Sequence, residues 1–441
     1  MTSAVPAIST DYAQRRRKLM ELMGENSIAI LPAAEPAMRN GGTEYAYRQN
    51  SDLLYLTGFL EPHSVLVLMP GREHGEMVLF CQDRDPSMEL WTGYRAGPEG
   101  ACKTYGADDA FPIDDVDDIL PGLLEGRAKV FYAMGCNQNF DLQLMEWIKQ
   151  IRSKARSGIY PPHEFVTVDH VLHELRLLKS KEEQSTMKQA GKISAQAHVR
   201  AMQICKPGMM EYELEAELLH EFVRNGARAP AYSSIVGGGA NGCILHYIEN
   251  NAELLNGDLV LIDAGCELDG YAADITRTFP INGRFSEAQA ALYEIVLDAQ
   301  QAAFDVIVPG SHWNQPHEAT VRVITEGLLK LGLLEGDLEQ LIEQEGYRDF
   351  YMHKAGHWLG MDVHDVGDYK IGGEWRVLEP GMVLTVEPGI YVSPHNTDVD
   401  EKWRGIGIRI EDDVIVTRTG CDVMSDGVPK TIQQIEQLMA G

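Results

Sequence analysis

Hydrophobic residues in the first third of the chain occur in short runs that alternate with amphipathic segments. Four apolar runs have the length of buried strands, and they lie at residues 27–31, 64–69, 77–80 and 129–132. Residues 12–24 and 140–153 instead space their apolar side chains with the period of a helix. This alternation predicts an α/β domain over residues 1–173.

A second pattern begins at residue 174, where helices and paired strands follow one another in blocks. Ser180 and Glu183 fit a capping box at the start of one helix, and a second helix over residues 211–225 is expected to end at Gly226. The same order then repeats, with helices from residue 286 and over 316–331 and with strands over 382–392 and 405–416. Residues 174–441 are therefore predicted to form an α+β domain with an internal pseudo-twofold duplication.

The stretch LVLIDAGCELDGYAADITRTF predicts a β-hairpin with one aspartate in each strand, Asp263 and Asp274. If Leu268 and Asp269 form the turn, the two aspartates lie directly opposite each other. If Asp269 and Gly270 form it, they are diagonal neighbours on one face. Either register brings the carboxylates within roughly 5–8 Å of each other. Because like charges repel and are costly to desolvate, we expect a cation between them rather than a solvated sheet face.

Two more acidic residues lie in strands that otherwise have core composition, Glu387 in VLTVEPG and Glu411 in GIGIRIEDD. A glycine-containing stretch between the two hairpins adds His353, His357 and His364. A lone histidine there would more often be a core residue, but three close together favour chemistry. Four carboxylates and a neutral imidazole balance the charge of two divalent cations.

The residue types also indicate which metals such a site prefers. A bridging hydroxide would complete it, because paired metals lower the pKa of water. Oxygen-rich ligands with one imidazole and no thiolate favour Mn²⁺, and Co²⁺ or Zn²⁺ could substitute. A structural zinc site would instead use cysteines and histidines.

Net charge, the lengths of apolar runs and the cysteine pattern argue against several classes of protein and partner. The chain has 441 residues, of which 44% are hydrophobic and 24% charged, and its net charge of −28 argues against nucleic acid or anionic membrane as a partner. No apolar run approaches the ~20 residues of a membrane-spanning helix, and the N-terminal residues lack a signal-type apolar core. Seven cysteines without a CxxC pair fit reduced thiols. We therefore expect a cytoplasmic protein with no membrane partner.

These residues resemble a known family. The order Asp-x10-Asp, His, Glu, Glu is similar to that of the dinuclear pita-bread metallopeptidases, which include methionine aminopeptidase, prolidase and aminopeptidase P. The chain is most similar to bacterial aminopeptidases P (Xaa-Pro aminopeptidases), in the stretches YRQNSD, NGCILHY, LVLIDAG, DITRTFP, HWLGMDVHD, VEPGIY and RGIGIRIE. The resemblance extends over nearly the whole chain and is most specific from residue 240 onward.

The resemblance implies a set of metal ligands. Asp263 would bind one metal, His357 and Glu387 would bind the other, and Asp274 and Glu411 would bridge the two. Glu387 would also carry a proton from the hydroxide to the leaving proline nitrogen.

The resemblance also implies roles around the metals. His246, His353 and His364 match active-site histidines that contact substrate and stabilise the tetrahedral intermediate. Arg409 would hold the bridging carboxylates in place. A peptide bond to proline has no N–H to grip, so we expect His246 to pack against the pyrrolidine ring. The alternative is that His246 is a structural support of the metal site.

Trp91 and Tyr391 are further candidate substrate contacts. The aromatic-rich residues 45–59 and 91–94 predict a homo-oligomer, a tetramer as in the bacterial family, unless these aromatic side chains fill the N-terminal core. One position departs from the family pattern: Gly42 stands where an acidic residue is expected to reach a neighbouring subunit's site, so cross-subunit contacts are in doubt.

We therefore predict a manganese aminopeptidase that releases the N-terminal residue of peptides with proline in second position. Prolidase, which cuts Xaa-Pro dipeptides only, is the near alternative because it shares the metal ligands. Methionine aminopeptidase lacks a large α/β N-terminal domain, and creatinase lacks the metal ligands. A non-catalytic peptide-binding pita-bread module is a remote alternative, which an intact set of five ligands disfavours.

Overall fold

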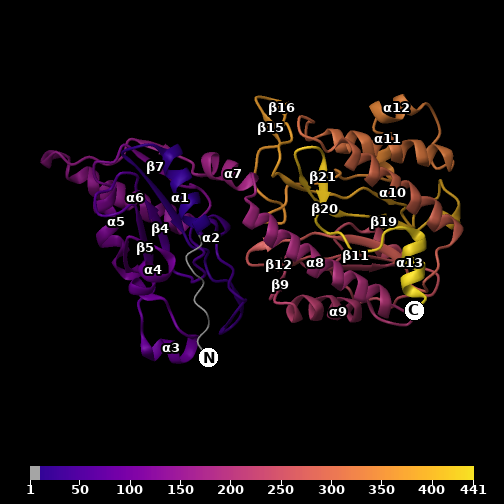
Figure 1. Ribbon diagram of the computed structural model, residues 1–441, viewed down its shortest axis with the longest axis horizontal. Helices are drawn as coiled ribbons and strands as arrows, with labels where there is room; N and C mark the ends of the chain where they lie inside the picture. The colour runs from indigo at the N-terminus through magenta and orange to yellow at the C-terminus, as the bar shows by residue number, and fades with distance from the viewer. Residues whose placement is uncertain (1–9) are drawn as a thin grey trace. The chain divides into compact units, whose positions relative to one another are not determined.

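A computed structural model of the protein describes residues 10–441 (Figure 1). The chain divides into two compact units, of which the first ends at Arg176 and the second is Leu177–Gly441. Among the described residues, no helix combines the length and the apolar character that crossing a bilayer requires.

The first unit is built on a mixed six-stranded sheet in the order β6-β5-β4-β1-β7-β8. Its strands are β1 (Ser27–Pro32), β4 (Val65–Leu68), β5 (Met77–Cys81), β6 (Asp109–Pro112), β7 (Lys129–Phe131) and β8 (Glu164–Val166). β4 runs antiparallel to both of its neighbours, β1 and β5, whereas β1–β7, β7–β8 and β5–β6 are parallel. A separate small hairpin pairs β2 (Met38–Asn40) with β3 (Thr43–Glu44).

Seven helices of the first unit lie between or beside these strands in the described part of the chain. They are α1 (Thr10–Met23), α2 (Ser51–Thr57), α3 (Pro86–Thr92), α4 (Gly97–Tyr105), α5 (Val116–Leu124), α6 (Gln138–Ser153) and α7 (Asp169–Leu177), the last of which ends at the boundary. Alternate strand residues such as Ile28 and Ile30 meet Leu120 of α5 and Trp147 of α6 in one buried cluster. The predicted α/β fold of this part is confirmed, because continuously buried strands lie at the predicted apolar runs and helices alternate with them.

The second unit surrounds short strands with long helices. The helices are α8 (Lys181–Ile204), α9 (Glu211–Arg224), α10 (Glu287–Val306), α11 (Gln315–Lys330), α12 (Leu338–Glu343) and α13 (Ile432–Met439). Ser180 and Ser286 both cap their helices through complete capping boxes, and Gly226 follows α9 in the left-handed region with φ 98°. Leu218 of α9 and Val296 of α10 belong to the large apolar cluster that supports the central strands.

Two three-stranded sheets occupy the centre of this unit (Figure 1). The first contains β10 (Ile235–Gly238), β11 (Leu259–Asp263) and β14 (Thr276–Pro280), and the second contains β17 (Val383–Val386), β20 (Asp412–Val416) and β21 (Cys421–Val423). A third three-stranded sheet has the order β13-β12-β9 and contains β9 (Ala229–Pro230), β12 (Cys266–Leu268) and β13 (Tyr271–Ala272). Two-stranded pairings join β15 (Lys370–Ile371) with β16 (Glu374–Trp375), and β18 (Gly389–Tyr391) with β19 (Gly407–Arg409). Helix pair and hairpin thus occur twice, as the predicted duplication requires.

The aspartate hairpin adopts the second of the two predicted registers. Asp263 pairs with Thr276, so the register in which it lies directly opposite Asp274 is wrong. The turn is Asp269–Gly270, with φ of 50° and 83°. Two successive positive φ angles twist a two-residue loop in the sense that matches the strands, and Asp-Gly is suited to them.

The second acidic hairpin differs from its prediction. Residues 382–392 and 405–416 are not two continuous strands, because each is interrupted where its acidic residue stands. Glu387 and Pro388 separate β17 from β18, and Ile410 and Glu411 separate β19 from β20. Proline has no N–H for a strand ladder, and the break turns each acid out of the regular pairing.

Candidate metal centre and active site

Four acidic side chains from the two hairpins meet around one imidazole. His357 Nε2 lies 3.5 Å from Asp274 Oδ2 and 3.7 Å from Glu387 Oε1. One ligand atom each of Asp274, His357 and Glu411 lies within 4.8 Å of the others. Asp263 joins the group through Tyr232, whose hydroxyl contacts both aspartates. The structure therefore brings together all five residues that the sequence analysis predicts as metal ligands.

Backbone hydrogen bonds hold His357 beside the second hairpin. The amide of Thr385 in β17 donates to the carbonyl of His357 at 3.0 Å, and the amide of Glu387 donates to the carbonyl of Ala355 at 2.9 Å. The first hairpin is joined to the second in the same way, since the amide of Glu411 donates to the carbonyl of Thr276 at 3.0 Å. The loop that carries His357 is thus hydrogen-bonded alongside β17, and this pairing fixes the imidazole relative to the acids.

The hydrogen bond of His357 assigns its tautomer. Its Nδ1 lies 3.0 Å from the carbonyl oxygen of Trp358, which can only accept. Nδ1 therefore carries the proton, and in the neutral ring Nε2 presents a lone pair toward Asp274 and Glu387. Histidine ligands of metals commonly use this arrangement, because the bond to the carbonyl orients the ring.

Arg409 connects the acids behind the site. Its guanidinium donates to Asp263 Oδ2 at 2.6 Å, to the Thr276 hydroxyl at 3.0 Å and to the Tyr391 hydroxyl at 2.9 Å. The Thr276 hydroxyl in turn donates to Glu411 Oε2 at 2.6 Å. Arg409 therefore binds Asp263 directly and reaches Glu411 only through Thr276, whereas the expected role was to hold the bridging carboxylates Asp274 and Glu411. That role stays a prediction.

Tyr232 occupies the space between the two aspartates of the first hairpin. Its hydroxyl lies 2.6 Å from Asp263 Oδ1 and 2.5 Å from Asp274 Oδ1. Burial and the charges of both aspartates raise the pKa of Tyr232 well above its usual value. A phenol that stays protonated relieves part of the repulsion between the two carboxylates.

The predicted histidines lie toward the solvent side of the site. The exposed His364 ring lies 4.3 Å from the His357 ring, measured between centroids. His353 Nδ1 donates to the carbonyl of Lys354 at 2.8 Å, so its Nε2 accepts from the Tyr391 hydroxyl at 2.9 Å. His246 stands in an exposed turn, close enough to His353 and His364 for its charge to lower the pKa of both, after the larger effect of burial.

Burial and mutual repulsion raise the pKa values of the acids. The pKa of Glu411 rises well above its ordinary value through burial and the charge of Asp274, and that of Asp274 rises through burial and the charge of Asp263. The same burial raises the pKa of Glu387 to about 7. Burial alone would lower the pKa of His357, but its hydrogen bond to Asp274 and the charge of Glu387 raise it to about 9.

This donor set fits divalent cations. Asp274 and Glu411 are almost completely buried, so their charges have little water to stabilise them. Oxygen donors with one imidazole whose second nitrogen is already engaged are a hard, oxygen-rich ligand set. The residues present can therefore hold the metals that the sequence predicts.

Three residues that contribute to the site were not predicted from the sequence: Tyr232, Thr276 and Thr385. Thr276 lies two residues after Asp274 in an extended segment, so both side chains are expected on the same face. This spacing could have predicted that Thr276 contributes to the site. Thr385 accepts from the amide of His357 at 3.1 Å. Tyr232 is distant in sequence from both aspartates and lies in a loop.

Tyr391 and Trp91, the candidate substrate contacts, lie in different surroundings. Tyr391 is fully buried beside Arg409, whereas Trp91 belongs to α3 in the first unit and is 83% exposed.

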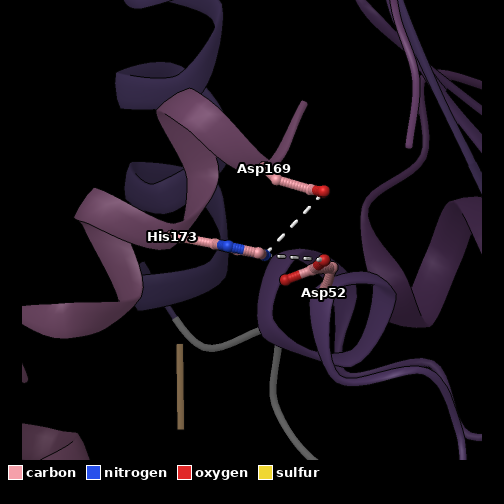
Figure 2. Close-up of side chains that lie close together, drawn as sticks. All are labelled: Asp52, Asp169 and His173. Atoms are coloured by element: carbon pink, nitrogen blue, oxygen red, sulfur yellow. Dashed lines mark ion pairs between the residues drawn. The ribbon is translucent and has the colours of Figure 1, made fainter. Parts of the chain in front are cut away.

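A second acid–histidine group lies in the first unit (Figure 2). His173 Nε2 lies 3.8 Å from Asp52 Oδ2 and 3.8 Å from Asp169 Oδ1. Asp52 is also paired with Arg176, whose Nη1 lies 2.7 Å away. Burial would raise the pKa of Asp52, but His173 and Arg176 lower it. The group ties α2 to α7 as an ion-pair network, and Arg176 already neutralises its most buried acid.

Comparison with known proteins places both parts of the chain. The profile of metallopeptidase family M24 matches residues 185–418, and that of the aminopeptidase P N-terminal domain matches residues 12–132. Xaa-Pro aminopeptidase of Escherichia coli strain K12 is 46% identical over 430 residues, which is 97% of each chain. Xaa-Pro aminopeptidase of Haemophilus influenzae is 43% identical, again over 97% of each chain.

Solved structures are similar over the same length. The aminopeptidase PepP of Pseudomonas aeruginosa has a TM-score of 0.97 at 64% identity and covers 98% of each chain. Zinc-substituted aminopeptidase P of Escherichia coli, in complex with product, has a TM-score of 0.96 at 46% identity, over 98% of this chain and 99% of that one.

The raised pKa values predict how the metal-free protein responds to pH. Glu387 titrates near 7 when folded and near 4.5 when unfolded, so its contribution to stability falls as the pH rises between these values. His357 gains stability from its proton below about 6.5, and that gain is lost as the pH rises through about 9. Both effects have the same sign. We expect the melting temperature of the chelated protein to fall by roughly 5 °C or more from about pH 5 to about pH 9.

Differential scanning fluorimetry with a chelator, and in parallel with Mn²⁺, measures this effect. The decline should be smaller with Mn²⁺, and Glu387→Gln should reduce it below neutral pH. A melting temperature of the chelated protein that rises over this range would contradict the assignment of repulsion among these acids.

Proposed function

The chain belongs to metallopeptidase family M24, and from this premise we propose that it is a dinuclear Xaa-Pro aminopeptidase with Asp263, Asp274, His357, Glu387 and Glu411 as its metal ligands. The observation that carries the proposal is the convergence of four acids and one correctly oriented imidazole in an apolar interior. The predicted similarity to bacterial aminopeptidase P, the two-part fold and the hydrolase class are confirmed by the family profiles and the curated relatives.

The two cations would neutralise the buried acids. Asp263 would serve one ion, His357 and Glu387 the other, and Asp274 and Glu411 both. When bound, the cations would lower the pKa of a water so that it can attack the peptide carbonyl near neutral pH. Mn²⁺ suits this oxygen-rich set best, with Co²⁺ or Zn²⁺ as substitutes. The related Escherichia coli protein is described as zinc-substituted, which agrees with a site that exchanges its metals.

The remaining steps fall to side chains of this chain. Glu387 would take a proton from the attacking water. It would pass that proton to the proline nitrogen, which leaves as an amine. Arg409 orients Asp263 through its hydrogen bond to Oδ2, and the Thr276 hydroxyl orients Glu411 in the same way.

The histidines would act on the substrate. His353 is held through both ring nitrogens, so the Tyr391 hydroxyl that it binds is fixed as well. His364 and His246 stand at the exposed side of the site, where the scissile carbonyl and the proline ring would lie. Because proline offers no amide hydrogen, a flat imidazole against its ring is a suitable way to select it.

Prolidase shares the ligand set, so substrate length separates the two activities. We expect the purified protein with Mn²⁺ to release alanine from Ala-Pro-Leu at least about ten times faster than it cleaves Ala-Pro, at equal subsaturating concentration. Ala-Ala-Leu is the matched control and should be a poor substrate. Product analysis by mass spectrometry measures all three, with chelator as the blank. Preference for the dipeptide would indicate a prolidase, and no cleavage of either would contradict the proposed function.

The predicted homo-oligomer is proposed on the basis of α3. Tyr55 and Phe59 are buried in the first unit, so these two side chains fill its core, as the alternative prediction states. Leu90 and Trp91 are each 83% exposed and Tyr94 is 92% exposed. Large apolar side chains so exposed in one short segment are typical of an interaction surface. We propose that this segment contacts other copies of the chain, in a tetramer.

Light scattering with size-exclusion chromatography tests the assembly. The wild-type protein should elute with the mass of a tetramer, and the double variant Leu90→Ser, Trp91→Ala should give smaller species. The exposed Leu142→Ser, on α6, is the control and should leave the mass unchanged. A monomeric mass of the wild type at micromolar concentration would contradict the proposal.

The cytoplasmic location is also part of the proposal. All seven cysteines are free in the structure, as expected of a protein in a reducing compartment. Peptides with proline in second position remain the proposed partners, without nucleic acid or membrane.

A further inference from the structure

The segment that carries His246 has little regular structure of its own. It leaves β10 at Gly238, makes a short 3-10 helix (Gly239–Cys243) and passes through a turn that contains His246. Ile244 and Ile248 on either side are more than half exposed. Cys243, Leu245 and Tyr247 pack on a small apolar cluster with Ile235, Leu261 and Tyr391, and polar contacts hold the segment on either side of the turn.

Both ends of this segment bind the same buried carboxylate. Glu211 is the first residue of α9 and is 0% exposed. Its Oε1 accepts from the amide of Gly238 at 2.8 Å and from the side-chain amide of Asn241 at 3.0 Å, before the turn. Its Oε2 accepts from the Tyr247 hydroxyl at 2.8 Å and from the amide of Ala252 at 2.9 Å, after the turn.

The local sequence is adapted to this arrangement. A Cβ on Gly238 would lie only 2.8 Å from Leu254 Cδ2, so glycine lets the backbone pass beside Leu254 where its amide binds Glu211. The start of a helix also favours an acidic side chain. Four donors to two oxygens fill the hydrogen-bonding capacity of a carboxylate, and a neutral amide could not accept them all.

The segment is connected to the metal site on its other side. A Cβ on Gly407 in β19 would lie 2.2 Å from the carbonyl oxygen of Gly242, so the two backbones are in direct contact. Gly407 stands two residues before Arg409 in the same strand. The segment therefore packs directly on β19, the strand whose Arg409 donates to Asp263. Glu211 contacts the segment at both of its ends.

We propose that Glu211 is a positioning residue for His246: by joining the two ends of its segment, the buried carboxylate sets where the imidazole stands at the substrate side of the metal site. This inference rests on the proposed function. Glu211 touches none of the proposed metal ligands through the bonds described, so its loss should move His246 and leave the metals bound.

A double-mutant cycle tests the coupling. The four proteins are the wild type, Glu211→Gln, His246→Ala and the double variant, each assayed on Ala-Pro-Leu with its bound metal measured. Each single change should lower kcat/KM by roughly 10- to 100-fold, since a misplaced active-site group costs about this much. In the His246→Ala background, Glu211→Gln should change kcat/KM by less than about 2-fold. Bound metal should be equal in all four.

Controls separate positioning from general damage. Glu213→Gln changes an exposed acid in the same helix and should leave kcat/KM unchanged. If Glu211→Gln fails to accumulate, Tyr247→Phe removes one of the four donors and keeps the carboxylate. It should lower kcat/KM by about 3- to 10-fold in the wild type and by less than about 2-fold without His246.

The outcomes are distinct. Losses that multiply in the double variant, or metal that falls in step with activity, would overturn the positioning role while leaving the proposed function intact. Full activity of His246→Ala would overturn it too, because there would be no imidazole to position. Failure of the wild type to cleave Ala-Pro-Leu would instead count against the proposed function.

Discussion

Repulsion among four buried carboxylates is the constraint on which the rest of the second unit depends. Asp263, Asp274, Glu387 and Glu411 stand at strand ends or strand breaks, where the chain can turn an acid inward without spoiling a ladder. Arg409 and Tyr232 offset part of the repulsion with one cation and one phenol. What remains is a cluster of negative charge in apolar surroundings, which the proposed divalent cations would neutralise. A site built this way is unfavourable when empty and therefore selective for cations.

The fold holds the proposed metal ligands more firmly than the proposed substrate contacts. The acids and His357 are fixed by strand pairing, backbone hydrogen bonds and the guanidinium of Arg409, so they can hold metals without rearrangement. The histidines proposed to meet the substrate are exposed, His246 in a turn and His364 in a bend. A single buried acid, Glu211, reaches the turn of His246 from behind. In the proposed mechanism, the metal ligands are thus held by the strands, whereas the substrate contacts lie in segments attached to those strands.

Sequence reasoning could predict what depends on local pattern. Capping residues at Ser180 and Ser286, the Asp-Gly turn and the acids in apolar strands all have short-range signals. It could not choose between the two hairpin registers, because both keep the aspartates on one face. It missed Tyr232, whose contacts span a loop, and it predicted strands through Asp274, Glu387 and Glu411, because apolar flanks conceal a break.

The most direct test of this account is anomalous diffraction from crystals of the protein grown with Mn²⁺. The account predicts two manganese peaks per chain about 3.5–4 Å apart, the spacing typical of two-metal sites, with Asp274 and Glu411 contacting both. Crystals of Glu411→Ala should lose at least one peak. A single ion in the wild type, or two ions that remain in place without Glu411, would contradict the claim that paired cations relieve this cluster.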